Sequence, residues 1–140
     1  MTGKEKREKI EKAIKELVVP FIRQQGFKGS FPHFRRENEN QLNLLGFQFS
    51  QYSSQFVVEI SNCKKDGFTT PWGKKLEPSE CRYYHPGNRH RLGAKTSNGD
   101  YWFDFDDESA KIDYYKERAK EVINYWSSAE QWWSENPYDF

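Results

Sequence analysis

Apolar residues near the start of the chain recur with the spacing of a helix. They are separated by four, three and four positions, which predicts an amphipathic helix that begins near Glu5. Pro20 falls inside the pattern and has no backbone N–H, so we expect a kink or a restart of the helix there. Gly26 then predicts the end of the helix. The recurring apolar positions are Ile10, Ile14, Leu17 and Phe21.

Three segments that follow this helix have the residue pattern of strands. The polar residues at 52–54 form a connection of hairpin length, so we expect an antiparallel meander. In the second segment the apolar phase slips by one position at Leu45–Gly46, which predicts a β-bulge. The three predicted strands are Ser30–Glu37, Gln41–Gln51 and Gln55–Cys63.

A second helical pattern occupies the last third of the chain. Its apolar residues alternate spacings of three and four without a break at Ser127-Ser128, which predicts one long helix after the capping pair Asp106-Asp107. We expect this helix to lie across the sheet and against the first helix, and a coiled-coil dimer is the alternative. The pattern consists of Ile112, Tyr115, Ala119, Val122, Trp126, Ala129 and Trp133.

Together these elements predict an α+β fold. We expect an antiparallel sheet of about four to five strands, packed on one face by an N-terminal helix and a long C-terminal helix. A length of 140 residues is typical of a single domain, so residues 1–140 are predicted to form one. Aromatic residues make up 17% of the chain, which contains one methionine. The core is therefore expected to consist largely of aromatic rings.

The middle of the chain combines a long connection with a dense cluster of aromatic and basic residues. Residues 64–88 are rich in glycine and proline, and Trp72 is expected to anchor this connection. The stretch Arg82–Asp106 predicts a hairpin. Its aromatic side, 101–105, is expected to help fill the core, whereas its basic side, 89–91, is expected to face a partner.

Charge is distributed unevenly, although the net charge is only +1. Residues 64–95 contain eight basic and three acidic residues, whereas 96–140 contain four and eleven. Such a division indicates either self-complementary packing or a basic face for an anionic partner. The first twelve residues are charged where a secretory signal would be apolar. With no apolar run long enough to span a bilayer, we predict a cytoplasmic protein with reduced cysteines and no membrane association.

Several short motifs resemble those of a known family. The run PFIRQQGFKGSFPHFRRE, residues 20–37, resembles the opening of the bacterial domain-of-unknown-function family 4304. Residues 42–60, with Phe47-Gln48, are similar to its paired strands, and Arg89–Gly93 followed by Asp100-Tyr101-Trp102 is similar to a later part of some members.

The resemblance covers roughly residues 15–105 and departs from the family pattern in the basic connection 64–88. It implies a small bacterial α+β protein and supplies no catalytic residues to transfer. A role for the 64–88 connection cannot be carried over from the family.

Candidate chemistry is sparse. The residue types that hold zinc occur at Cys63, Cys81, His85 and His90, but no C-x2-C pair accompanies them. We therefore predict neither a metal nor another cofactor. The chain also lacks a nucleophile elbow and a phosphate-binding glycine loop, so an enzyme is the less favoured class.

The favoured hypothesis is a non-enzymatic protein-interaction module with an immunity-like or regulatory role, because Arg, Tyr and Trp dominate binding energies at interfaces. One alternative is binding of single-stranded nucleic acid or another anionic ligand through residues 64–95, where cations interleave with rings. A small enzyme of unknown chemistry is another. The binding surface is expected on the sheet face away from the helices or beneath the 64–88 loop, with Arg89 and Arg91 as anion-binding groups. Its predicted residues are Arg35, Gln48, Tyr83, His85, Arg89, Arg91 and Trp102.

Overall fold

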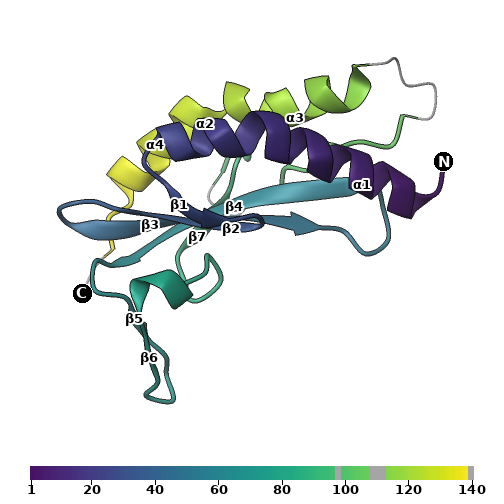
Figure 1. Ribbon diagram of the computed structural model, residues 1–140. Helices are drawn as coiled ribbons and strands as arrows, with labels where there is room; N and C mark the ends of the chain where they lie inside the picture. The colour runs from purple at the N-terminus through teal and green to yellow at the C-terminus, as the bar shows by residue number, and fades with distance from the viewer. Residues whose placement is uncertain (97–98, 108–112, 139–140) are drawn as a thin grey trace.

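The computed structural model describes residues 1–96, 99–107 and 113–138. Its helices lie together on one side of an antiparallel sheet, and a small hairpin projects from the other side (Figure 1). The predicted α+β class is confirmed, as is the placement of both terminal helices on one face. None of the helices in the described part of the chain has the length and apolarity needed to cross a membrane.

The N-terminal helical region consists of three consecutive segments, α1 (Gly3–Ala13), a π-helical turn (Ile14–Val18) and α2 (Val19–Gln24). The predicted disturbance near Pro20 takes the form of this π-helical turn, which directly precedes the first turn of α2. Pro20 is among the first residues of α2 and lacks the N–H that would bond to the preceding turn. Across these segments the fully buried side chains recur every four residues, at Ile10, Ile14, Val18 and Ile22, instead of with the predicted spacing of four, three and four.

Gly26 ends α2 as predicted. Its φ of 95° lies in the left-handed region that glycine adopts without strain. The turn brings Phe27 back under the helices, where its ring centroid lies 5.7 Å from that of Trp126 and 5.2 Å from that of Trp133. The chain can therefore enter the sheet directly from the end of the helix.

The main sheet has the strand order β1-β2-β3-β4-β7, and a further short strand, β8, also pairs with β4. The predicted meander is confirmed in β2, β3 and β4. The predicted strand 30–37 is divided, however, because Phe31 and Pro32 form a tight turn between β1 and β2, with Ser30 paired to His33. The strands are β1 (Lys28–Ser30), β2 (His33–Glu37), β3 (Gln41–Phe49), β4 (Gln55–Lys64), β7 (Arg89–Arg91) and β8 (Phe103–Asp104).

The predicted β-bulge at Leu45–Gly46 is wrong. The pairing of β3 with β4 runs in unbroken register from one end of β3 to the other, and Gly46 lies directly opposite Glu59. The apolar phase slips because β3 is buried on both faces. Leu44 packs on the side of the hairpin, whereas Leu45 packs on the side of the helices.

The predicted hairpin within Arg82–Asp106 is also wrong. Both β7 and β8 pair with the same edge of β4, with Arg91 opposite Glu59 and Phe103 opposite Phe56. They therefore form one interrupted edge strand. The expected core role of this stretch is nevertheless confirmed, because Phe103 is buried against the helices.

The C-terminal helix is bent where a single continuous helix was predicted. Tyr125 separates α3 (Tyr114–Asn124) from α4 (Trp126–Glu135), and its ψ of 4° interrupts the helical geometry. The predicted apolar pattern continues across the bend, where α3 packs against α1 and α4 packs against β4. The pattern is thus buried within the chain rather than free for a coiled coil. Its buried members are Ala119, Val122, Trp126, Ala129 and Trp133, whereas Ile112 lies outside the described residues.

Residues 65–88, which we call the covering loop, contain the hairpin of β5 (Phe68–Thr69) and β6 (Lys75–Leu76) and a 3-10 turn (Pro78–Glu80). Trp72 was predicted to anchor this loop, but it lies in the hairpin turn and its exposed fraction is 78%. The actual anchors are apolar side chains packed against Leu42, Leu44 and Cys63 of the sheet. They are Leu76, Cys81 and Tyr83.

Candidate functional site: the helix-free face

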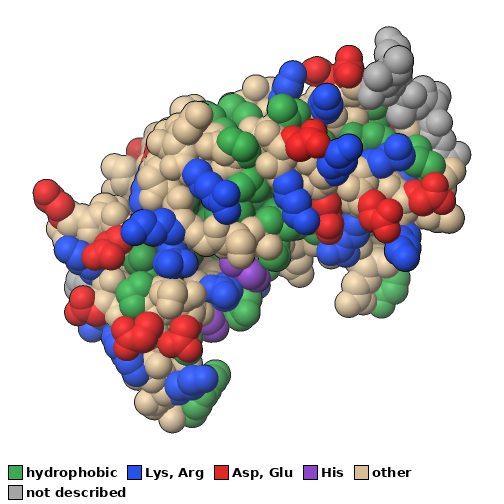
Figure 2. All heavy atoms as spheres, in the orientation of Figure 1, with side chains coloured by type: hydrophobic (Ala, Val, Ile, Leu, Met, Phe, Trp, Pro, Cys, Tyr) green, Lys and Arg blue, Asp and Glu red, His purple; other side chains and the backbone are tan. Residues whose placement is uncertain are grey.

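The face of the sheet that points away from the helices carries most of the polar groups singled out from the sequence. Neighbouring residues in register share a face. Gly46 therefore has His33 on one side and Glu59 on the other, and Arg91 follows Glu59 on β7. We call this surface the helix-free face. In Figure 2 the corresponding side of the molecule is hollowed beside the projecting hairpin, and histidine side chains lie near the base of that hairpin.

Tyr83 of the covering loop lies directly on the helix-free face. A Cβ atom at Gly46 would come within 2.4 Å of the Tyr83 ring, so the ring position requires glycine there. The Tyr83 hydroxyl donates a hydrogen bond of 3.1 Å to Gln48 Oε1, and its ring stacks on His33 with the centroids 6.0 Å apart. Burial raises the pKa of Tyr83 above its usual value, so the hydroxyl acts as a neutral donor.

Glu59 is the charged centre of this face. Its side chain is only 3% exposed and accepts a hydrogen bond of 2.8 Å from Arg91 Nε. Arg89 Nη1 lies 3.3 Å from the other carboxylate oxygen. Arg91 also pairs with Asp100 at 2.8 Å and lies 5.1 Å from the centre of the Trp102 ring. An anion binding to Arg89 or Arg91 would therefore have to compete with carboxylates of the chain itself.

Three buried polar atoms on the helix-free face have no hydrogen-bond partner among the described residues. They belong to β2 and β4, which flank β3, and are His33 Nδ1, Glu59 Oε2 and Ser61 Oγ. Glu59 Oε2 is within ion-pair distance of Arg89 but lacks hydrogen-bond geometry. Burial lowers the pKa of His33, and the nearby Arg82 and His85 lower it further, so the imidazole is neutral near pH 7. With Tyr83 in place these atoms are shielded from solvent.

Five of the seven predicted site residues meet in one region. Gln48, Arg89 and Arg91 lie on the helix-free face, Tyr83 covers it, and Trp102 flanks it. Glu59 was not among the predicted site residues, although a charged residue between Val58 and Ile60 was a usable signal.

The other two predicted residues lie at the border of this region, because His85 is close enough to His33 to lower its pKa and Arg35, opposite Leu44, is on the same face of the sheet. His85 accepts a hydrogen bond of 2.9 Å from the Arg82 backbone N–H and stacks on Phe68. Arg35 lines a separate cleft of about 430 Å³ between the outer strands and the 3-10 turn, together with Lys28 and Glu77.

The candidate zinc ligands do not converge. Cys63 and Cys81 come together in one buried cluster, but His90 lies on the opposite face of the sheet and stacks on Trp132 with ring centroids 5.8 Å apart. Within the part of the chain that the structure describes, no group of three or more His, Cys, Asp or Glu residues is arranged to hold a metal ion.

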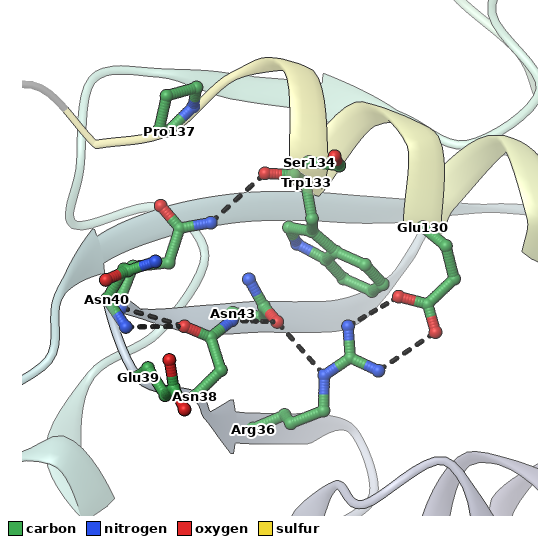
Figure 3. A pocket seen from close by; sticks show the side chains of 10 residues that line it. Arg36, Asn38, Glu39, Asn40, Asn43, Glu130, Trp133, Ser134 and Pro137 are labelled. Atoms are coloured by element: carbon green, nitrogen blue, oxygen red, sulfur yellow. Dashed lines mark hydrogen bonds and ion pairs between the residues drawn. The ribbon is translucent and has the colours of Figure 1, made fainter.

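A second depression of about 490 Å³ lies between the β2–β3 turn and the C-terminal helix. Figure 3 shows that its polar side chains bind one another: Arg36 faces Glu130 and also donates to Asn43 at 3.0 Å. Gln41 Nε2 donates to the Trp133 carbonyl at 3.1 Å. The Arg36 hydrogen bond holds the pKa of Glu130 below its usual value. Because these groups satisfy each other, we interpret the depression as the attachment of the C-terminal helix to the sheet.

Fold and site together define an α+β domain with helices on one face of an antiparallel sheet and a polar, loop-covered surface on the other. Residues 17–135 match the family model described as "Domain of unknown function (DUF4304)". Since this match covers most of the chain, the protein belongs to that family, which confirms the resemblance and extends it through the C-terminal helix. Comparisons with curated proteins and with solved structures returned no match.

Proposed function

We propose that this protein is a non-enzymatic protein-interaction module that binds its partner through the covering loop. The observation that carries this proposal is the exposure of two large aromatic side chains on that loop. Trp72 is 78% exposed at the turn of the β5–β6 hairpin, and Tyr84 is 52% exposed beside the helix-free face. Both residue types are enriched among those that contribute most to binding at protein interfaces.

The geometry around these rings favours a protein over a nucleic acid. The covering loop contains acidic as well as basic side chains, with Glu77 and Glu80 beside the cations. Arg89 and Arg91 are already paired with Glu59. A single-stranded nucleic acid needs a continuous run of cations along its backbone, whereas a mixed rim around aromatic side chains is usual at protein interfaces.

We infer a single-domain cytoplasmic module with a regulatory or immunity-like role. Its neutral Tyr83, buried Glu59 and neutral His33 support a packed structural layer beneath the loop rather than a catalytic centre. The exposed rings are then the contact residues. Tyr84 packs against Tyr83 and His33 of this layer, whereas Trp72 lies at the turn of the projecting hairpin.

The test compares capture of partners from an extract of the native host by three forms of the full chain: wild type, the double variant Trp72→Ala/Tyr84→Ala, and Tyr52→Ala. Tyr52 is the matched control because it is 94% exposed but lies in the β3–β4 connection. A protein retained by wild type and by Tyr52→Ala, but lost by the double variant, supports the proposal. The captured protein, once purified, should then bind the double variant about 30-fold more weakly than it binds wild type, as expected when interface contacts of about 2 kcal/mol are lost.

Two results would count against it. Equal capture by all three forms would place the interface elsewhere. Salt-sensitive binding of single-stranded DNA or RNA, with no captured protein, would favour the nucleic-acid alternative.

A further inference from the structure

The covering loop is attached to the sheet at a point where two cysteines meet. Cys63 lies in the central strand β4 and is 0% exposed, and Cys81 follows the 3-10 turn of the loop and is 2% exposed. Both are free thiols within one buried cluster. Each thiol donates to a backbone carbonyl of its own segment, Cys63 to Lys64 at 3.5 Å and Cys81 to Glu77 at 3.4 Å. The shared cluster therefore brings one cysteine of the sheet and one of the loop together at the attachment point.

From this arrangement we propose that Cys63 and Cys81 form a reversible dithiol–disulfide pair, and that its oxidation covalently fastens the covering loop to strand β4. The bond would close a ring that includes the whole β5–β6 hairpin. This inference concerns the attachment of the loop and does not rest on the proposed function.

The surroundings assign different roles to the two sulfur atoms. The neighbouring Cys63 thiol lowers the pKa of Cys81 against the opposing effect of burial, and the backbone N–H of Phe68 and the positive charges of Lys75 and Arg82 lower it further. The neighbouring Cys81 thiol and burial raise the pKa of Cys63. Because the thiolate is the reactive form, Cys81 is the attacking sulfur and Cys63 is the resolving one.

The reaction with a small disulfide such as oxidised glutathione then balances in two steps. The Cys81 thiolate attacks one glutathione sulfur, the S–S bond of the oxidant breaks, and one glutathione thiolate leaves. Cys63 next loses its proton and attacks the Cys81 sulfur, which releases the second glutathione. Two protein thiols are oxidised, and one small disulfide is reduced to two thiols.

Burial makes this reaction depend on loop motion. Both sulfur atoms are screened from solvent by Leu76 and Tyr83, which pack in the same cluster. An oxidant reaches Cys81 only when the segment around the 3-10 turn lifts, whereas Cys63 stays fixed in β4 by its pairing with β3. The pair is therefore reduced at rest and becomes oxidised in proportion to loop opening.

The test incubates the folded full chain in glutathione buffers with increasing fractions of oxidised glutathione. Samples are quenched in acid and analysed by intact mass and peptide mapping. Wild type should lose the mass of two hydrogen atoms, yield a Cys63–Cys81 linked peptide, and recover on reduction with dithiothreitol. Cys63→Ala should instead retain one glutathione on Cys81. In Cys81→Ala the adduct on Cys63 should form at least about tenfold more slowly.

Thermal unfolding of the oxidised and reduced wild type supplies a second measurement that needs no variant. The disulfide should raise the midpoint by roughly 5–10 °C, as expected for a loop of this length. A wild type that stays reduced while folded and forms the bond only in denaturant would overturn the proposal. A lower midpoint on oxidation would overturn the fastening role. Equal adduct rates in the two alanine variants would overturn the assigned roles of the sulfur atoms.

Discussion

Gly46→Ala is the substitution that most sharply tests how the covering loop lies on the sheet. Gly46 has an ordinary strand conformation, so alanine suits its backbone. The added methyl group would nevertheless lie 2.4 and 2.6 Å from two carbons of the Tyr83 ring, far closer than carbon atoms approach in folded proteins. Tyr83 would have to move, and its hydrogen bond to Gln48 would be lost.

The expected cost follows from two opposing contributions. Overpacking a filled site costs about 1–3 kcal/mol, and complete expulsion of a large aromatic ring would cost about 3–5 kcal/mol. Replacing glycine in a strand returns about 0.5–1 kcal/mol through the lower entropy of the unfolded chain. We therefore expect Gly46→Ala to lower the free energy of unfolding by about 1–3 kcal/mol.

Urea unfolding of wild type, Gly46→Ala, Tyr83→Ala and the double variant measures this coupling directly. In the Tyr83→Ala background the nearest remaining atom to the methyl group is His33 Nδ1 at 3.2 Å, so alanine at position 46 should cost much less than in the wild-type background. The result that refutes the reasoning is an equal cost of Gly46→Ala in both backgrounds, because the Tyr83 ring would then not lie on Gly46.

Four further substitutions test other contacts in the fold. Glu59→Gln should lower the free energy of unfolding by about 1–3 kcal/mol, because it removes the buried charge between two arginines. Arg89→Ala truncates a half-exposed side chain and should lower it by less than about 1 kcal/mol. Urea unfolding of both variants checks which of them costs more. Trp72→Ala should change stability by less than about 0.5 kcal/mol by the same assay, because an exposed ring adds little to folding. The pKa of Glu130 is lower in the folded state than in the unfolded chain, so its ionised side chain stabilises the fold at pH values above the unfolded pKa of about 4.3. This stabilisation is lost as the pH falls through the folded pKa. Glu130→Gln should therefore cost about 1 kcal/mol at pH 7, and the difference from wild type should shrink toward pH 3 in parallel urea titrations.

The local patterns of the sequence predicted the elements well, because spacing reflects burial directly. The alternation in β3 and β4 and the apolar pattern of the last helix both became buried surfaces of the fold. The phase slip in β3 was misinterpreted for a non-local reason. Leu44 is buried only because a loop from elsewhere in the chain covers it, and alternation alone cannot distinguish a bulge from a strand with two buried faces.

The candidate site was predicted only in part, because contacts between distant parts of the chain complete it. Arg89 and Arg91 alternate along a strand and therefore share a face, which their spacing indicated. Their partner Glu59 comes from a different strand, and the contact depends on the register of β7 against β4. The interrupted edge strand was missed because nothing local shows that β7 and β8 pair with β4 rather than with each other.

The covering loop is proposed as the partner-binding surface. The most direct test is oxidative footprinting, which compares the free chain with its complex with the captured partner. Side-chain oxidation is measured by mass spectrometry at exposed rings on both sides of the molecule. The account predicts that oxidation of Trp72 and Tyr84 falls in the complex, whereas that of Tyr52 is unchanged. Protection confined to the helices, with Trp72 and Tyr84 as reactive as in the free chain, would contradict it.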